Sequence, residues 1–95
     1  MTWSISEAAL RDVDEIEAWT AHKWDDEQAY LYIAAIFDAV ARLSHSSFRW
    51  SVESVRPGLF RAKAGSHLIF YRITELDEVH VVRVLHEVMD IPSHL

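Results

Sequence analysis

The spacing of apolar residues in the first half of the chain predicts two amphipathic helices. From Glu7 to about Lys23, apolar positions recur three or four residues apart among acidic ones, and Ser6 is placed to cap this helix. A second helix is expected after Asp25, which forms a capping-box pattern with Gln28. Its apolar seam consists of Ala29, Ile33, Ile36, Val40 and Leu43. Because only a short junction separates the two stretches, we expect an antiparallel helical hairpin.

The rest of the chain carries the shorter periodicity and the turn residues that are typical of strands. Residues 2–5 alternate polar and apolar side chains, which predicts a short first strand. Three further strands are expected at residues 59–64, 67–74 and 79–85. The turn Arg56-Pro57-Gly58 precedes the first of them. Residues 67–74 are apolar on both faces, so this strand is expected at the centre of the sheet.

This order of elements predicts an α+β fold. The N-terminal strand and the two-helix hairpin would pack on a small curved antiparallel sheet, followed by a short C-terminal tail that is helical or flexible. Residues 44–55 show no regular pattern that would predict their conformation. With 95 residues, of which 51% are hydrophobic, the chain has material for one core. We therefore expect a single domain over residues 1–95.

Composition adds expectations about the compartment. The chain has no cysteine, which removes disulfides and thiolate metal sites and is compatible with a reducing environment. The start of the chain lacks the basic segment of a signal peptide, and no apolar run approaches the ~20 residues that a membrane helix needs. These observations predict a cytoplasmic protein without a membrane partner.

The charge is distributed unevenly between the two halves. Residues 1–41 hold two basic and nine acidic side chains, a balance of -7, whereas residues 42–95 hold seven basic and six acidic ones, a balance of +1. An acidic half repels phosphate, so the chain alone is not expected to bind nucleic acid.

The residues with catalytic potential do not form a recognisable motif. The six histidines include no pair at metal-ligand spacing on one element, with His67, His80, His86 and His94 scattered over strands and tail. No serine lies in a nucleophile-elbow pattern, and the serines occur in caps and turns. We therefore expect no bound metal, no cofactor and no catalytic residues.

Arginines and tryptophans are the candidates for a binding surface. If Arg61, Arg72 and Arg83 point to the same face of the sheet, they would form a cationic patch for a carboxylate or phosphate. The alternative is that they make ordinary ion pairs with the acidic helices. The four tryptophans are interpreted as packing residues, of which one or two would be exposed as anchors for a partner: Trp3, Trp19, Trp24 and Trp50.

Several short motifs follow one another in an order that resembles a known family. They are Trp24 with Gln28-Ala29, Arg56-Pro57-Gly58-Leu59, Gly65-Ser66-His67, Ile69-Phe70-Tyr71-Arg72, Arg83-Val84-Leu85-His86 and Met89-Asp90. In this order and spacing the chain resembles the ParE branch of the ParE/RelE toxin superfamily over nearly its full length. Residues 44–55 depart from the pattern of the family.

The resemblance implies a function that the residues alone do not. A ParE-like chain is expected to be the toxin of a type II toxin–antitoxin system that stabilises a plasmid or chromosome, to be neutralised by a ParD-type antitoxin, and to poison DNA gyrase by binding rather than by catalysis. Two alternatives stay open: a RelE-type ribosome-dependent mRNA endonuclease, with Tyr71, Arg72, Arg83 and His86 as its candidate residues, and a ParE-like binding module with a target other than gyrase.

The resemblance also suggests where the partners bind. Target binding is expected at the arginines and the C-terminal segment: Arg61, Arg72, Arg83, His86, Met89, Asp90, His94 and Leu95. Antitoxin binding is expected at apolar positions of the second helix and the following strand: Ile33, Ile36, Phe37, Val40, Leu59 and Phe60.

Overall fold

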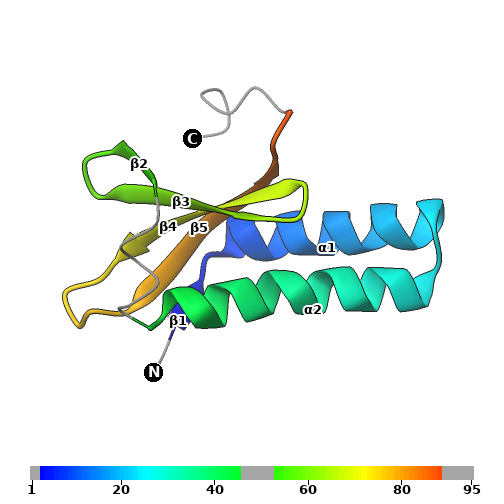
Figure 1. The fold of residues 1–95 in the computed structure, drawn as a ribbon, viewed down its shortest axis with the longest axis horizontal. Helices are drawn as coiled ribbons and strands as arrows, with labels where there is room; N and C mark the ends of the chain where they lie inside the picture. Colours follow the sequence, from blue (N-terminus) through cyan, green and yellow to red (C-terminus); the bar gives the residue numbers. More distant parts are fainter. Residues whose placement is uncertain (1–2, 46–52, 89–95) are drawn as a thin grey trace.

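Both expected helices are present in a computed structural model, which describes residues 3–45 and 53–88 of the chain. Helix α1 spans Glu7–Lys23 and helix α2 spans Asp26–Leu43, and they form the expected antiparallel hairpin (Figure 1). Both caps are confirmed, since Ser6 Oγ accepts a hydrogen bond from the Ala9 amide at 3.0 Å and Asp25 Oδ1 accepts one from the Gln28 amide at 2.7 Å. Neither helix is long and apolar enough to cross a membrane.

The sheet has the expected central strand. Its strands are β1 (Trp3–Ile5), β2 (Glu53–Arg56), β3 (Leu59–Ala64), β4 (His67–Ile73) and β5 (Val79–His86). Their order across the sheet is β1-β5-β4-β3-β2, which places β4 in the middle. The pairs β2–β3, β3–β4 and β4–β5 are antiparallel. The predicted strand ranges therefore hold to within a residue at each end.

Two features of the sheet differ from the expectation. First, β1 pairs with β5 in parallel, so the sheet is mixed rather than purely antiparallel. The alternation of residues 2–5 predicts a strand but contains no information on its direction, which depends on where the helical hairpin returns the chain. Second, β2 lies at the end of the segment 44–55, whose sequence shows no regular pattern, and continues into Arg56 of the predicted turn. It is a four-residue edge strand with an irregular register, too short for alternation to identify.

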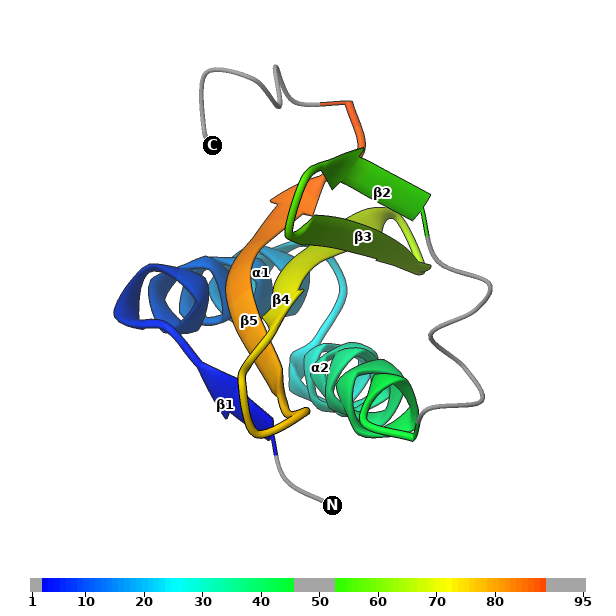
Figure 2. The ribbon, with the colours of Figure 1, turned by 90° about the vertical axis from the view of Figure 1, so that its left-hand side faces the viewer.

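The helices cover one face of the curved sheet (Figure 2). The core between the two layers is formed by Ala9, Val13, Ile16, Ile36, Ala39, Val40 and Leu43 of the helices and by Ile69, Tyr71, Val79, Val81 and Val84 of the sheet. A smaller cluster of Leu59, Phe70 and Leu85 lies on the opposite face. The hairpin extends beyond the sheet, so its turn projects from the molecule (Figure 1).

A bulge in β5 controls the direction of an important side chain. Phe70 pairs with Arg83 and the next residue, Tyr71, pairs with Val81, so Val82 is an extra residue in β5. Val82 packs against the small outer cluster. The irregular backbone at this point allows Arg83 to turn toward α1 instead of continuing the alternation of the strand.

Candidate functional site

An ion pair between α1 and β5 holds the first helix on the sheet. Arg83 donates from Nε to Asp12 Oδ2 and from Nη2 to Asp12 Oδ1, both at 2.8 Å. The Val84 amide donates to Asp12 Oδ2 at 2.9 Å. These bonds to Asp12, partly offset by burial, raise the pKa of Arg83 above its usual value. Arg83 therefore has a structural role, as the ion-pair alternative anticipated.

The expected arginine patch forms only in part. Arg72 and Arg83 line a cavity of about 300 Å³ together with Arg56, Leu59 and Val82, next to the first turn of α1. Arg61 does not line this cavity. Arg61 and Arg83 are both Cα partners of Phe70 in the sheet, but only Arg83 reaches the cavity. Three arginines thus surround one cavity, but Arg56 takes the place expected for Arg61.

Two histidines that are distant in sequence meet where β4 and β5 pair. The rings of His67 and His86 lie edge to face with centroids 5.1 Å apart. Tyr32 of α2 shares a hydrogen bond of 2.6 Å with His67 Nδ1, and the Ser66 amide donates to the Tyr32 hydroxyl at 3.0 Å. Burial lowers the pKa of His67, His86 lowers it further, and Glu87 opposes the change. Burial thus favours the neutral form of His67, and the hydrogen bond with Tyr32 fixes the orientation of its ring.

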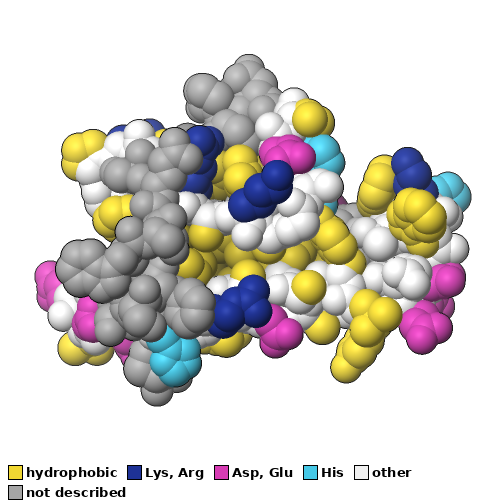
Figure 3. All heavy atoms as spheres, viewed as in Figure 1, with side chains coloured by type: hydrophobic (Ala, Val, Ile, Leu, Met, Phe, Trp, Pro, Cys, Tyr) yellow, Lys and Arg dark blue, Asp and Glu magenta, His cyan; other side chains and the backbone are white. Residues whose placement is uncertain are grey.

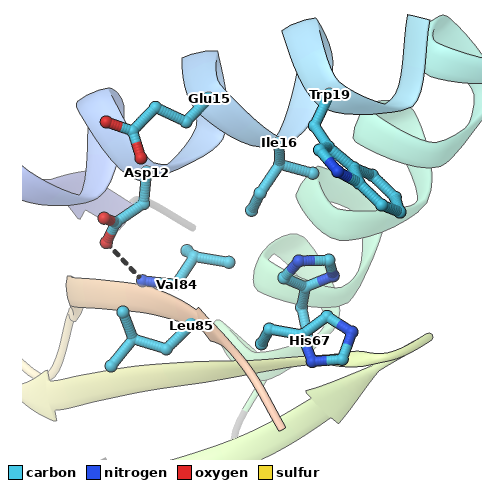
Figure 4. A pocket seen from close by; sticks show the side chains of 8 residues that line it. Asp12, Glu15, Ile16, Trp19, His67, Val84 and Leu85 are labelled. Atoms are coloured by element: carbon cyan, nitrogen blue, oxygen red, sulfur yellow. Dashed lines mark hydrogen bonds between the residues drawn. The ribbon is translucent and has the colours of Figure 1, made fainter. Parts of the chain in front are cut away.

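The histidines form one wall of a second cavity, of about 340 Å³ (Figure 4). The other wall belongs to α1. The lining residues are Asp12, Glu15, Ile16 and Trp19 of the helix and His67, Val84, Leu85 and His86 of the strands. His86 was the only one of these predicted to bind a target. The spacing of the helical residues marks one face of α1, but the sequence does not show that β4 and β5 bring His67 and His86 to that face.

The residues predicted for antitoxin binding fall into two groups. Ile36, Val40 and Leu59 are each 1% exposed, so they lie in the interior of the isolated chain and offer no surface there. The spacing of Ile36 and Val40 reflects the main core of this fold, and Leu59 belongs to the smaller cluster on the other face of the sheet. Ile33, Phe37 and Phe60 are partly buried and pack against the main core.

The remaining predicted positions have no structural description. Met89, Asp90, His94 and Leu95 lie outside the described residues. Within the described part of the chain, no three His, Asp or Glu side chains are grouped as ligands for a metal ion. That finding does not test the expectations that the chain binds no cofactor and has no catalytic residues, and both stay predictions.

Comparison of the fold with solved structures gives similar chains of the toxin–antitoxin class. The chromosomal ParDE toxin–antitoxin system from P. aeruginosa superposes with a TM-score of 0.79 at 18% identity, covering 90% of this chain and 95% of the other. The RelBE2 toxin–antitoxin complex from Mycobacterium tuberculosis gives a TM-score of 0.56 at 23% identity, covering 90% and 96%. At these identities the likeness shows a common fold, which agrees with the α+β RelE/ParE-like expectation.

Sequence comparison identifies the family itself. The chain is 35% identical over 92 residues to Toxin ParE1 of Mycobacterium tuberculosis, covering 96% of this chain and 94% of that protein. It is 31% identical over 94 residues to Toxin ParE1 of Caulobacter vibrioides, covering 98% and 96%. The family model of the ParE toxin of the type II toxin–antitoxin system parDE matches residues 4–91. The chain therefore belongs to the ParE family of type II toxins, within the ParE/RelE superfamily.

Proposed function

We propose that this chain is a cytoplasmic toxin that poisons DNA gyrase and blocks replication, and that a ParD-type antitoxin neutralises it. The observation that carries the proposal is the match to the ParE toxin model over residues 4–91, together with two ParE1 relatives that align over nearly their full length. We infer that the toxin acts by holding its target in one state, so that it makes and breaks no bonds itself.

The arrangement of the residues suggested for an RNA nuclease supports binding over catalysis. Tyr71 is fully buried in the core, and Arg83 is engaged by Asp12. Arg72 lines the arginine cavity, whereas His86 lines the separate cavity beside α1. A general acid, a general base and a phosphate-binding group must converge on one reacting bond, and these four side chains do not share a site.

The antitoxin is proposed to bind where the core is incompletely covered. A band of hydrophobic side chains is visible between the sheet and α2 (Figure 3). Ile33, Phe37 and Phe60 are partly buried members of the core cluster and come from α2 and β3, the elements that border this band. An amphipathic antitoxin segment that covers them would bury further apolar surface and stabilise the toxin.

The decisive experiment is a supercoiling and cleavage assay with purified gyrase, run beside a ribosome-dependent mRNA cleavage assay. We expect protein-linked DNA breaks that increase with toxin concentration and disappear when antitoxin is added. Cut mRNA without DNA breaks would replace this proposal with the RelE-type nuclease. If neither DNA breaks nor cut mRNA appear and the antitoxin still binds tightly, the chain would be a ParE-like module with a different target.

A truncation separates the two binding functions. Removing the residues after His86 is expected to abolish gyrase poisoning while antitoxin binding survives at least in part, because the helices and the sheet are retained. Growth inhibition in cells and an antitoxin pull-down measure the two functions on the same variant. A truncated chain that still arrests growth would exclude the C-terminal segment as the active surface.

A further inference from the structure

The cavity between α1 and the ends of β4 and β5 is lined by two carboxylates that share one arginine, Arg83. Of the two acidic residues that line it, Asp12 already accepts three hydrogen bonds, two from Arg83 and one from the Val84 amide. Glu15 is exposed, and no described residue donates it a hydrogen bond or forms an ion pair with it. Arg83 also attracts Glu15 electrostatically, but one guanidinium faces two carboxylates, so the α1 wall keeps a net negative charge.

The remaining walls of the cavity are apolar or aromatic. Ile16, Val84 and Leu85 are buried and form its floor. Trp19 lies one helical turn from Glu15 on the same face of α1, and its side chain is 58% exposed. Lys23 Nζ lies 4.9 Å from the centroid of the Trp19 ring, so this indole already attracts a cation within the chain.

This combination selects one kind of ligand. A volume of about 340 Å³ is at the small end of ligand cavities, which span about 300–1,000 Å³, and suits a single side chain. An aliphatic floor, an aromatic ring and a carboxylate together match a side chain with an apolar stem and a cationic head. Arginine fits better than lysine, because a guanidinium is planar, stacks on indole and is more weakly hydrated than an ammonium.

We propose that this cavity receives an arginine side chain of the antitoxin, with its stem against Ile16 and Leu85 and its guanidinium stacked on Trp19. The exposed Glu15 side chain, which points toward Asp12 in Figure 4, turns toward this guanidinium when the arginine binds. This inference rests on the proposed function, and it specifies that the antitoxin presents an arginine side chain to this cavity. The balance of -7 over residues 1–41, which include all of α1, would also attract a basic antitoxin segment toward this wall.

The cavity itself is tested with small probes, without any antitoxin. Agmatine carries a guanidinium on an aliphatic stem, n-butylammonium carries an ammonium, and butyrate carries the opposite charge. Binding is followed in a ¹H–¹⁵N spectrum by the indole signal of Trp19, assigned with a Trp19→Phe variant. We expect agmatine to shift this signal at the lowest concentration, n-butylammonium to bind more weakly, and butyrate to leave it unchanged.

Two matched pairs of variants locate the binding. Glu15→Gln should weaken agmatine binding about two- to fivefold, as for a partly exposed ion pair, whereas Glu17→Gln, on an exposed part of α1 outside the cavity, should not. Trp19→Ala should abolish the response of the Ile16 methyl signals, whereas Trp24→Ala, which is also exposed but outside the cavity, should not. Equal binding of agmatine and n-butylammonium, or an unchanged affinity in Glu15→Gln, would overturn the assignment.

Binding of the antitoxin to charge-reversed variants distinguishes a failure of this inference from a failure of the proposed function. Glu15→Lys is expected to weaken binding of the cognate antitoxin at least tenfold, and Glu17→Lys much less. If the antitoxin binds the wild type and Glu15→Lys equally, the arginine assignment is wrong and the toxin–antitoxin pairing stands. If no antitoxin binds the wild type, the proposed function fails, and this inference fails with it even where agmatine occupies the cavity.

Discussion

At the scale of single residues, Asp12 connects two layers of the fold. It is 9% exposed, belongs to α1, and accepts hydrogen bonds from the side chain of Arg83 and the backbone of Val84 in β5. β4 pairs with β5 on one side at Val84, but β1 ends at Ile5, so no strand lies on the other side at this point. There the Asp12 carboxylate takes the place of a strand as acceptor for the Val84 amide. A carboxylate on a helix thus completes the edge of a sheet.

Removing this carboxylate should destabilise the protein strongly. Asp12→Ala leaves the Val84 amide and the Arg83 guanidinium without their shared acceptor, so we expect a loss of about 2–4 kcal/mol in unfolding free energy. Asp14→Ala is the control, because Asp14 is exposed on the same helix and undergoes the same chemical change. Urea denaturation of the two variants measures the difference. Similar losses in both would show that the contact contributes little to stability.

The lowered pKa of His67 predicts a dependence of stability on pH. The unfolded chain has the ordinary value of 6.5 and takes up a proton before the folded chain, whose His67 is surrounded by Tyr32, His86 and Glu87. The contribution of His67 is therefore complete above pH 6.5 and decreases as the pH falls toward the folded-state pKa. Urea unfolding between about pH 7.5 and 5.5 should show a steeper decline for the wild type than for His67→Gln. His22→Gln, at an exposed position, should behave as the wild type.

At the scale of elements, the turn between β3 and β4 is fitted to α2 at Gly65. Its φ is +60°, and a Cβ added there would lie 2.8 Å from both Cε1 and the hydroxyl oxygen of Tyr32. That hydroxyl holds the Ser66 amide and His67. The turn therefore does more than reverse the chain, since its backbone is also bonded to the second helix.

A pair of glycine variants separates backbone strain from this contact. Gly58 also has positive φ, at +79°, but a Cβ there would meet no atom closer than Arg72 Nη1 at 3.6 Å. Gly58→Ala should cost about 1–2 kcal/mol for the left-handed backbone alone. Gly65→Ala should cost at least about 1 kcal/mol more, because Tyr32 must move and release its hydrogen bonds. Thermal denaturation of both variants gives the comparison, and equal losses would argue against a tight contact at Tyr32.

The same elements show where sequence reasoning succeeds and where it stops. Both helices and the strands β3, β4 and β5 follow from local patterns, because caps, periodicity and turn residues act over a few neighbouring positions. The direction of β1, the strand β2 and the bulge at Val82 depend on pairing between distant segments. The cavity beside α1 escapes local reasoning for that reason, since α1 and His67 line one cavity only after β5 has paired with β4. Ile36 and Val40, which the sequence predicts for antitoxin binding, show the converse, because an apolar seam does not reveal whether it faces a core or a partner.

At the scale of the whole molecule, the hairpin extends past the sheet that it covers (Figure 1). Large apolar side chains near its turn remain exposed, with Trp19 at 58%, Trp24 at 66%, Tyr30 at 69% and Leu31 at 52%. Hydrophobic side chains gather at this projecting end beside charged ones (Figure 3). Surface of this kind favours association with a partner over existence as a free domain.

This exposure predicts a large stabilisation by the antitoxin. A partner that binds only the folded toxin raises the unfolding free energy by about 2.7 kcal/mol at a free concentration 100 times its Kd. We expect the melting temperature to rise with antitoxin concentration accordingly. Differential scanning fluorimetry at several antitoxin concentrations measures this, with a ParD-type antitoxin of another pair as control. An unchanged melting temperature would contradict the expectation that the antitoxin recognises the folded toxin.

The parallel pairing of β1 with β5 has a consequence for synthesis of the toxin. Among the described residues, the first strand, β1, pairs with the last one, β5, and the main core includes residues from both ends of the described chain. A ribosome must therefore release the chain at least through β5, which ends at His86, before the sheet can close, and such long-range pairing folds slowly compared with local structure. An antitoxin that is already folded and abundant would meet the toxin as it matures, before an active molecule reaches its target.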